Sequence, residues 1–320
     1  MKILVPLSRC GLIERYVQAG ADEFYLGFHD QVWTEQFGTY SDINRMSGFG
    51  SYANRTPIEE VADVIETVHH YGKNIYITLN ANTYSPEQMK YIESVYYPIL
   101  KKADGIIIST LAMAEKLKEN AIPAVASTMC GIYNSDLADL YAKAGVKRMI
   151  LPRDLMLDEI EKIIKTHPDN EFEVFFMRNG CILSDAHCLG MHRPECGATC
   201  AMLRYKQEQI VSDCTSFQDK HDIDVNSYLY NGMLLTHACA LCAVYRLQKM
   251  GVRTLKIVGR SDDADQVEED VRLSKRNLDI AVQCSSEEEY LENMIFPPYA
   301  PQVCRLGMSC YYPEVRFGKE

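Results

Sequence analysis

Residues 148–177, RMILPRDLMLDEIEKIIKTHPDNEFEVFFM, are the stretch of sequence that decides the fold. They begin with a short apolar run at 148–152, continue with apolar residues at helical spacing over 155–166, and end with a second apolar run at 171–177. Apolar residues at intervals of three and four indicate a helix with one buried face, and short runs rich in Ile, Val and Phe indicate buried strands. A strand, a helix and a second strand in this order predict a βαβ unit with parallel strands.

The same alternation continues on both sides of this unit. Strands are also predicted at 3–7, 23–28, 74–80, 105–109, 124–128 and 254–258, and helices at 12–19, 57–71, 85–103, 111–120, 134–145 and 262–280. Eight strands with intervening helices predict an α/β fold, a TIM-barrel-like parallel (β/α)8 barrel with a cysteine-rich insertion after strand seven. The alternative is an open doubly wound sheet. It is disfavoured because neither G-x-G-x-x-G nor G-x-x-x-x-G-K-[ST] follows any strand.

Charge and composition exclude several classes of function. The 320 residues include 33 Lys or Arg and 44 Asp or Glu, so the formal net charge is −11. General nucleic-acid binding relies on clustered Lys and Arg, so the acidic balance argues against it. No apolar run reaches the roughly 18 residues that span a bilayer, and the first residues, MKILVPLSR, do not resemble a secretion signal. We expect a cytoplasmic protein with no membrane association.

The cysteines point to ligand chemistry. Twelve cysteines in a large chain without an export signal indicate thiolate ligation rather than disulfides. Four follow the seventh strand and two more lie on a later segment predicted to be helical: Cys181, Cys188, Cys196, Cys200, Cys239 and Cys242. Structural zinc sites use two closely spaced cysteine pairs. The wider spacing here favours a 4Fe-4S cluster, with zinc as the second choice and redox-active thiols as the third.

Several motifs resemble those of a known family. The strand exit EVFFMRNGC at 173–181 is followed by Cys188 and by CGATC at 196–200. The motifs AGADEFYLG at 19–27, GKNIYITLN at 72–80, GVKRMILPR at 145–153 and GVRTLKIVGR at 251–260 occur in the family's order. Together they are similar to the collagenase-like peptidase U-32 family over most of residues 1–265.

This resemblance implies a domain organisation, a cofactor and a reaction. It implies a barrel domain at 1–265 that includes a cluster-binding segment at 178–242, followed by a C-terminal helix and tail at 266–320. It implies a 4Fe-4S cluster on Cys181, Cys188, Cys196 and Cys239, with Cys200 or Cys242 as replacements for one of these. Family members with known roles hydroxylate tRNA, ribosomal RNA or a ubiquinone precursor without oxygen gas, with prephenate as the oxygen donor. The resemblance therefore implies an anionic co-substrate such as prephenate, and a paralogous partner subunit.

Three classes of function stay open on the sequence. The first is a hydroxylase-like enzyme that modifies a small molecule, a peptide or RNA. The second is a collagenase-like peptidase of unknown catalytic type, although neither H-E-x-x-H nor G-x-S-x-G occurs. The third is a non-catalytic iron–sulfur electron-transfer protein. Asp154 replaces the glutamate of the family's R-E-L motif and Val258 the glutamate of its K-x-E-G-R motif, which weakens any transfer of acid or base roles.

Three cations are the candidate catalytic residues. Arg153, Lys256 and Arg260 lie at the ends of predicted strands, and a barrel carries its active site where its strands end. Guanidinium groups bind carboxylates in a forked geometry, so three cations at one mouth suit a dicarboxylate. The alternative is that they pair with nearby carboxylates of this chain: Asp154, Asp262 and Asp263.

Overall fold

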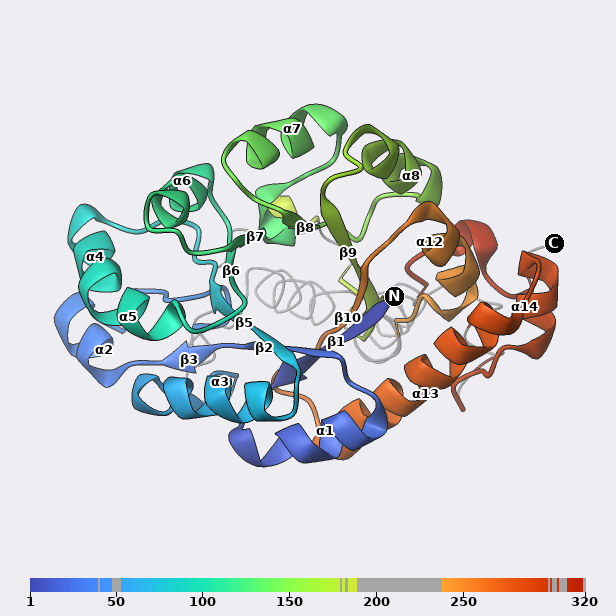
Figure 1. Cartoon of the computed structure of the whole chain (residues 1–320), viewed down its shortest axis with the longest axis horizontal. Coiled ribbons are helices and arrows are strands. Elements are labelled where there is room, and N and C mark those ends of the chain that lie inside the picture. The colour runs from blue at the N-terminus through green and yellow to red at the C-terminus, as the bar shows by residue number, and fades with distance from the viewer. Residues whose placement is uncertain are drawn as a thin grey trace, which may run out of the picture.

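The computed structural model describes residues 1–39, 41–47, 53–178, 180–181, 184–188, 238–298, 300, 304 and 310–318. Eight parallel strands form a closed barrel, which confirms the predicted fold (Figure 1). The strands are, in spatial order, β1 (Lys2–Leu7), β2 (Glu23–Leu26), β5 (Asn74–Leu79), β6 (Gly105–Ile108), β7 (Ala124–Ala126), β8 (Arg148–Ile150), β9 (Glu171–Met177) and β10 (Thr254–Ile257), which pairs again with β1.

Helices surround the strands, and most of them bury one apolar face (Figure 1). In α8, for example, Leu157, Ile160 and Ile163 are buried against the barrel. The helices are α1 (Ile13–Ala19), α2 (Gln31–Phe37), α3 (Val61–His70), α4 (Pro86–Tyr91), α5 (Tyr97–Leu100), α6 (Leu111–Glu119), α7 (Ser135–Lys143), α8 (Leu157–Thr166), α12 (Val244–Met250), α13 (Ala264–Gln283) and α14 (Glu287–Asn293). None in the described ranges is both long and apolar enough to cross a bilayer.

The structure differs from the predicted elements in several places. The strand predicted at 23–28 ends at Leu26, and the chain then forms β3 (Phe28–His29), which pairs with β4 (Thr56–Pro57) in a small separate sheet. The helix predicted at 85–103 contains a π-helical stretch at Ile92–Tyr96 and ends at Leu100. Periodicity along the chain does not predict the β3–β4 pair, because this pair joins segments almost thirty residues apart.

The third difference concerns Cys239, which was predicted to lie on a helix one turn from Cys242. Cys239 instead has an extended backbone that pairs with Met177 on one side and with Cys310 on the other. A 3-10 helix covers Leu241–Ala243, and α12 starts only at Val244. The prediction was wrong because pairing with two distant segments outweighs local helical periodicity.

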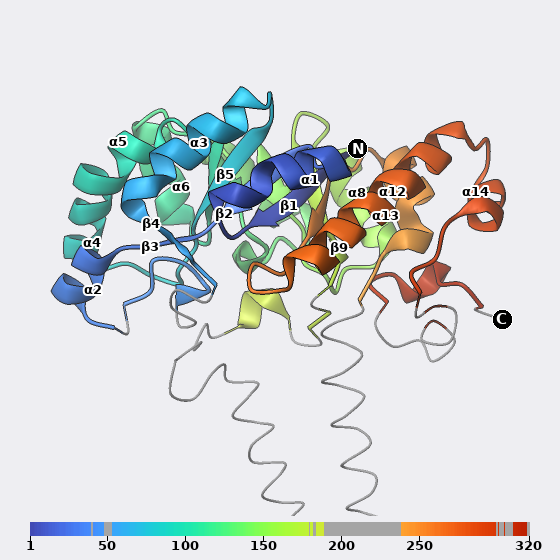
Figure 2. The same cartoon turned by 90° about the horizontal axis from the view of Figure 1, so that it is seen from below.

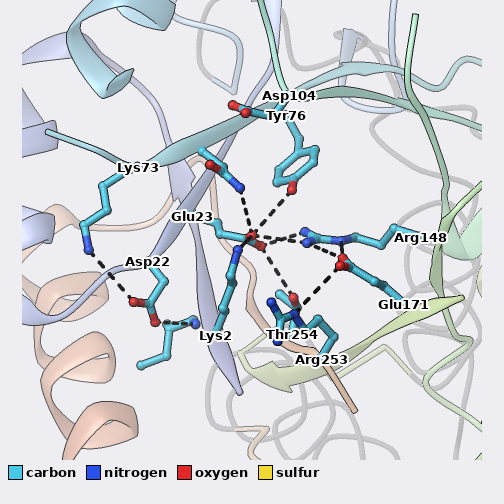
Figure 3. Close-up of polar contacts among 12 residues, drawn as sticks. Lys2, Asp22, Glu23, Lys73, Tyr76, Asp104, Arg148, Glu171, Arg253 and Thr254 are labelled. Carbon is cyan, nitrogen blue, oxygen red and sulfur yellow. Dashed lines mark hydrogen bonds and ion pairs between the residues drawn. The ribbon is translucent and has the colours of Figure 1, made fainter. Parts of the chain in front are cut away.

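A buried ionic network closes the barrel at the amino ends of the strands (Figure 3). Glu23, whose side chain is fully buried, receives the Lys2 ammonium at 2.7 Å and the Arg148 guanidinium at 2.6 and 3.1 Å. Burial opposes ionisation of Glu23, but the bonds from Arg148 and Lys2 outweigh it and lower the pKa of the carboxyl group. In barrels of this kind the amino-terminal face contributes stability rather than catalysis. The network therefore serves the fold and leaves the opposite face for function.

The C-terminal part of the chain completes the outer ring. Residue 265, where a domain boundary was predicted, lies in the first turn of α13. This helix packs against α1, β1 and β10, and α14 packs against α12 and α13. Gly20, at the end of α1, lets the two helices approach, since a Cβ there would lie 2.9 Å from the Lys275 side chain. The helix that follows residue 265 is thus packed directly on the barrel.

Candidate functional site

The candidate site lies at the carboxyl ends of the barrel strands. Figure 2 shows the N-terminus, where β1 starts, on the upper side, and the short yellow-green 3-10 helix Asp185–His187 on the lower side. Thr78 lies near the end of β5, Arg153 follows β8 and Arg260 follows β10. Active sites in parallel barrels are built at this face.

Arg260 is a buried cation whose hydrogen-bond partners among the described residues are all neutral side chains. Its Nη1 donates to Asn54 Oδ1 at 2.9 Å and to Thr78 Oγ1 at 3.1 Å, and its Nη2 donates to Asn44 Oδ1 at 3.4 Å. Its exposed fraction is 8%, and none of the carboxylates in the described ranges forms an ion pair with it. Burial lowers the pKa of Arg260 to about 10. A buried guanidinium without a counter-ion is suited to bind an anion.

Gly27 makes room for this guanidinium. A Cβ at Gly27 would lie 1.7 Å from Arg260 Nη1 and 2.2 Å from Asn54 Oδ1, far inside van der Waals contact. The buried Nδ2 of Asn44 has no hydrogen-bond partner among the described residues. Because buried donors are normally paired, this amide is a second group able to contact a ligand beside Arg260.

Arg153 lies on the same face but has a carboxylate partner. Its Nε donates to Asp185 Oδ2 at 2.7 Å and its Nη2 to Asp185 Oδ1 at 3.1 Å, while its guanidinium stacks over Phe175 with 4.2 Å to the ring centre. Arg45 donates to the same carboxylate at 2.6 Å. Burial opposes ionisation of Asp185, but the charges of Arg153 and Arg45 outweigh it and lower its pKa. Two arginines therefore share one carboxylate at the mouth.

Lys256 occupies the layer below the mouth. Its Nζ donates to Glu173 Oε1 at 2.8 Å and lies 4.2 Å from the centre of the Tyr25 ring. Burial lowers the pKa of Lys256, although Glu173 acts in the opposite direction. Arg153 and Lys256 do pair with carboxylates, as the alternative from sequence supposed, but with Asp185 and Glu173 rather than with Asp154, Asp262 or Asp263.

Three of the four predicted cluster cysteines lie within the described ranges, and Cys196, like its rival Cys200, lies outside them. Cys181, Cys188 and Cys239 are partly buried. Tyr311 lies beside Cys239, since its backbone N–H donates to the Cys239 carbonyl at 3.1 Å. Burial raises the pKa of Tyr311, Arg153 lowers it, and the charges of Asp185, Cys239 and Cys181 raise it further. Cys188 lies near enough to Arg45 to raise the pKa of that side chain, against the effect of burial. These thiols thus lie around the same mouth as the arginines.

Half-buried thiols beside cationic side chains are a donor set that suits an anionic iron–sulfur cluster. No three His, Cys, Asp or Glu side chains of the described ranges lie close enough to hold a single metal ion. This does not argue against a cluster, because its ligands bind different irons at separate corners and lie farther apart. Cys239 also has Cys310 as a bridge partner, so Cys310 is another thiol near the predicted ligand set.

Sequence reasoning missed five site residues: Asn44, Arg45, Asn54, Thr78 and Asp185. Asn44 and Arg45 lie in the long polar segment after the second strand, which has no period from which a position could be inferred. Asp185 had a detectable signal, because it is an acidic residue between two cysteines predicted to bind an anionic cluster.

The fold and this face define a class of protein, a parallel (β/α)8 barrel that carries cysteines and buried arginines at its carboxyl-terminal mouth. The model of peptidase family U32 matches residues 11–298, so the chain belongs to this family.

Curated relatives in this family are considerably longer than this chain. The 23S rRNA 5-hydroxycytidine synthase of Escherichia coli is 24% identical over 99% of this chain and 46% of its own length. The tRNA hydroxylation protein P1 of Bacillus subtilis is 22% identical over 91% of this chain and 65% of its own length. This chain therefore spans about half to two thirds of these proteins. A solved structure of a U32 peptidase is similar with a TM-score of 0.43 and 12% identity, covering 55% of this chain and 69% of the other.

Proposed function

We propose that this chain is a hydroxylase-like enzyme that modifies RNA without oxygen gas, with a 4Fe-4S cluster and a dicarboxylate such as prephenate as oxygen donor. Relatives named for hydroxylation of tRNA and ribosomal RNA support RNA as the substrate among the classes left open by the sequence. The same relatives support an enzyme over an electron-transfer protein. Because RNA is the proposed substrate, we expect the protein to act in the cytoplasm, and a paralogous partner subunit or a further segment to supply basic surface.

The observation that carries the proposal is the buried Arg260 with only neutral hydrogen-bond partners among the described residues. A carboxylate of the donor would neutralise this charge and accept from the free amide of Asn44. Arg153 would contact the second carboxylate from the exit of β8, which β9 separates from β10. Lys256 shares its charge with Glu173, so we expect it to contribute less than the two arginines.

The residues present would hold the cluster through Cys181, Cys188, Cys196 and Cys239. When bound, it would supply electron transfer and a site for an oxygen atom of the donor. The protein's own residues would orient the donor through charge-assisted hydrogen bonds and exclude water, since Arg153 and Arg260 are both largely buried.

Anaerobic purification followed by iron and sulfide quantitation tests the cofactor. About four irons and four sulfides per chain support the proposal, whereas stoichiometric zinc without sulfide overturns it. Calorimetric titration with prephenate tests the donor site. We expect Arg260→Ala to weaken binding at least roughly tenfold, the factor that about 1.4 kcal/mol represents.

Arg253→Ala is the matched control for this titration. Arg253 precedes β10 at the opposite end of the barrel, is half exposed and forms only a long ion pair with Glu171 at 3.8 Å. Its removal should leave prephenate binding unchanged. Equal binding by the parent protein and both variants would show that Arg260 does not contact the donor.

A further inference from the structure

Asp185 is the most heavily engaged carboxylate at the mouth of the barrel. Its side chain is fully buried, and its two oxygens accept from Arg153 at 2.7 and 3.1 Å, from Arg45 at 2.6 Å and from Thr128 Oγ1 at 3.1 Å. These partners come from three separate parts of the chain: the segment before β4, the β7–α7 connection and the β8–α8 connection. Asp185 thus joins three walls of the mouth.

Asp185 also lies within the cysteine-bearing segment, four residues after Cys181 and three before Cys188. The backbone N–H of Cys188 donates to the Asp185 carbonyl at 3.2 Å, which ties the second cysteine to this turn. Ala186 packs against Gly131, where a Cβ would lie 3.0 Å away. The ion pairs of Asp185 therefore hold this turn against the barrel.

We propose that Asp185 is a positioning residue that anchors the segment carrying Cys181 and Cys188 and sets the local charge that these cysteines experience from Arg45 and Arg153. Among the described residues, Asp185 is the carboxylate that forms ion pairs with both guanidinium groups, so its charge balances theirs beside the proposed ligands. A cluster with thiolate ligands becomes more negative on reduction, so the balance between Asp185 and its arginines controls its reduction potential.

The electrostatic contacts agree with this arrangement. Burial lowers the pKa of Arg153, but Asp185, Tyr311 and Cys181 raise it, and the outcome is a raised value. Burial likewise lowers the pKa of Arg45, whereas Asp185 and Cys188 raise it, and the result is a raised pKa. Each arginine is therefore bonded to Asp185 and also responds to the charge of one of the two cysteines.

The anchor is testable without any cofactor. We would alkylate the cluster-free full chain with iodoacetamide over a range of pH, so that the rates of the fully ionised thiols are compared, and measure modification of Cys181 and Cys188 by mass spectrometry. Asp185→Asn should accelerate alkylation of both at least about tenfold, which corresponds to about 1.4 kcal/mol of lost anchoring. Cys284, which follows α13 and lies outside this segment, is the internal reference and should not change. Unchanged rates at Cys181 and Cys188 would overturn the proposal.

Asp30→Asn is the matched control. Asp30 is also a buried carboxylate, but it accepts from the Val32 amide at 2.8 Å and from Tyr91 and Tyr96 hydroxyls at 2.9 Å, with no arginine among these partners. It should lower global stability without accelerating alkylation. If Asp185→Asn does not fold, Thr128→Val removes one bond to the same carboxylate and should give a smaller acceleration at the same two cysteines. Equal alkylation in Thr128→Val and the parent protein would then overturn the anchor.

The second readout rests on the proposed cluster. In cluster-loaded protein, Asp185→Asn should shift the reduction potential to more positive values, because a negative charge beside the cluster is lost, whereas Asp30→Asn should not. Equal potentials in all three proteins would overturn the electrostatic part. A chain that loads no cluster at all would contradict the proposed function, while the alkylation measurement would still decide whether Asp185 anchors the segment.

Discussion

Replacing Gly27 by alanine tests the anion site without removing any charged group. The added Cβ would lie 1.7 Å from Arg260 Nη1 and 2.2 Å from Asn54 Oδ1. The neighbours are tips of side chains, so the guanidinium can move away while the barrel keeps its strands. The displacement breaks the bonds from Arg260 to Asn54 at 2.9 Å and to Thr78 at 3.1 Å.

Hydrogen bonds to charged groups contribute about 1.5–3 kcal/mol each. Displacing Arg260 breaks two such bonds and should therefore lower the free energy of unfolding by about 3–6 kcal/mol. If Arg260 contacts the donor, the same displacement should weaken prephenate binding roughly ten- to a hundredfold.

Calorimetric titration at constant ionic strength measures the affinity, and urea denaturation measures the stability. Gly11→Ala is the control, since a Cβ at Gly11 would have no heavy atom within 4 Å. A folded Gly27→Ala protein that binds prephenate as tightly as the parent protein would refute the reasoning.

Other predictions concern stability, pH, the cysteines and proteolysis. Glu23→Gln should lower the free energy of unfolding by about 3–5 kcal/mol because it leaves Arg148 buried without its main partner. Glu171→Gln, which removes a half-exposed partner of the same arginine, should cost under about 1 kcal/mol, and equal losses in urea denaturation would contradict the network. The pKa values of Glu23 and Asp185 are lowered by folding, so their stabilisation should be complete above about pH 5 and fall as the pH drops below about 4, with a weaker dependence in Glu23→Gln. Replacing any of the four proposed cluster cysteines by alanine should reduce bound iron and sulfide, whereas Cys130→Ala should not. Purified protein should not cleave gelatin, and cleavage abolished by one point substitution would favour the peptidase alternative.

The sequence by itself determined the barrel. Each barrel strand is a short apolar run and most of the surrounding helices have a repeating apolar face, so local periodicity was enough to place all eight strands within a few residues. It also indicated that Arg153 and Arg260 follow strands, because the end of a strand is a local property. The sequence could not show that the hydrogen-bond partners of Arg260 in the described part of the chain would all be neutral.

Only the tertiary structure decided which charges meet. Lys256 pairs with Glu173 because the neighbouring strands β9 and β10 place both side chains in the barrel interior. This pairing depends on the register between the two strands. Asp185 contacts Arg45, which is 140 positions away in the sequence, and Arg153, which is 32 positions away. Cys239 likewise pairs with the distant Cys310. Such contacts arise when the barrel closes and brings distant loops to one face, whereas periodicity reports only on neighbours within a few turns.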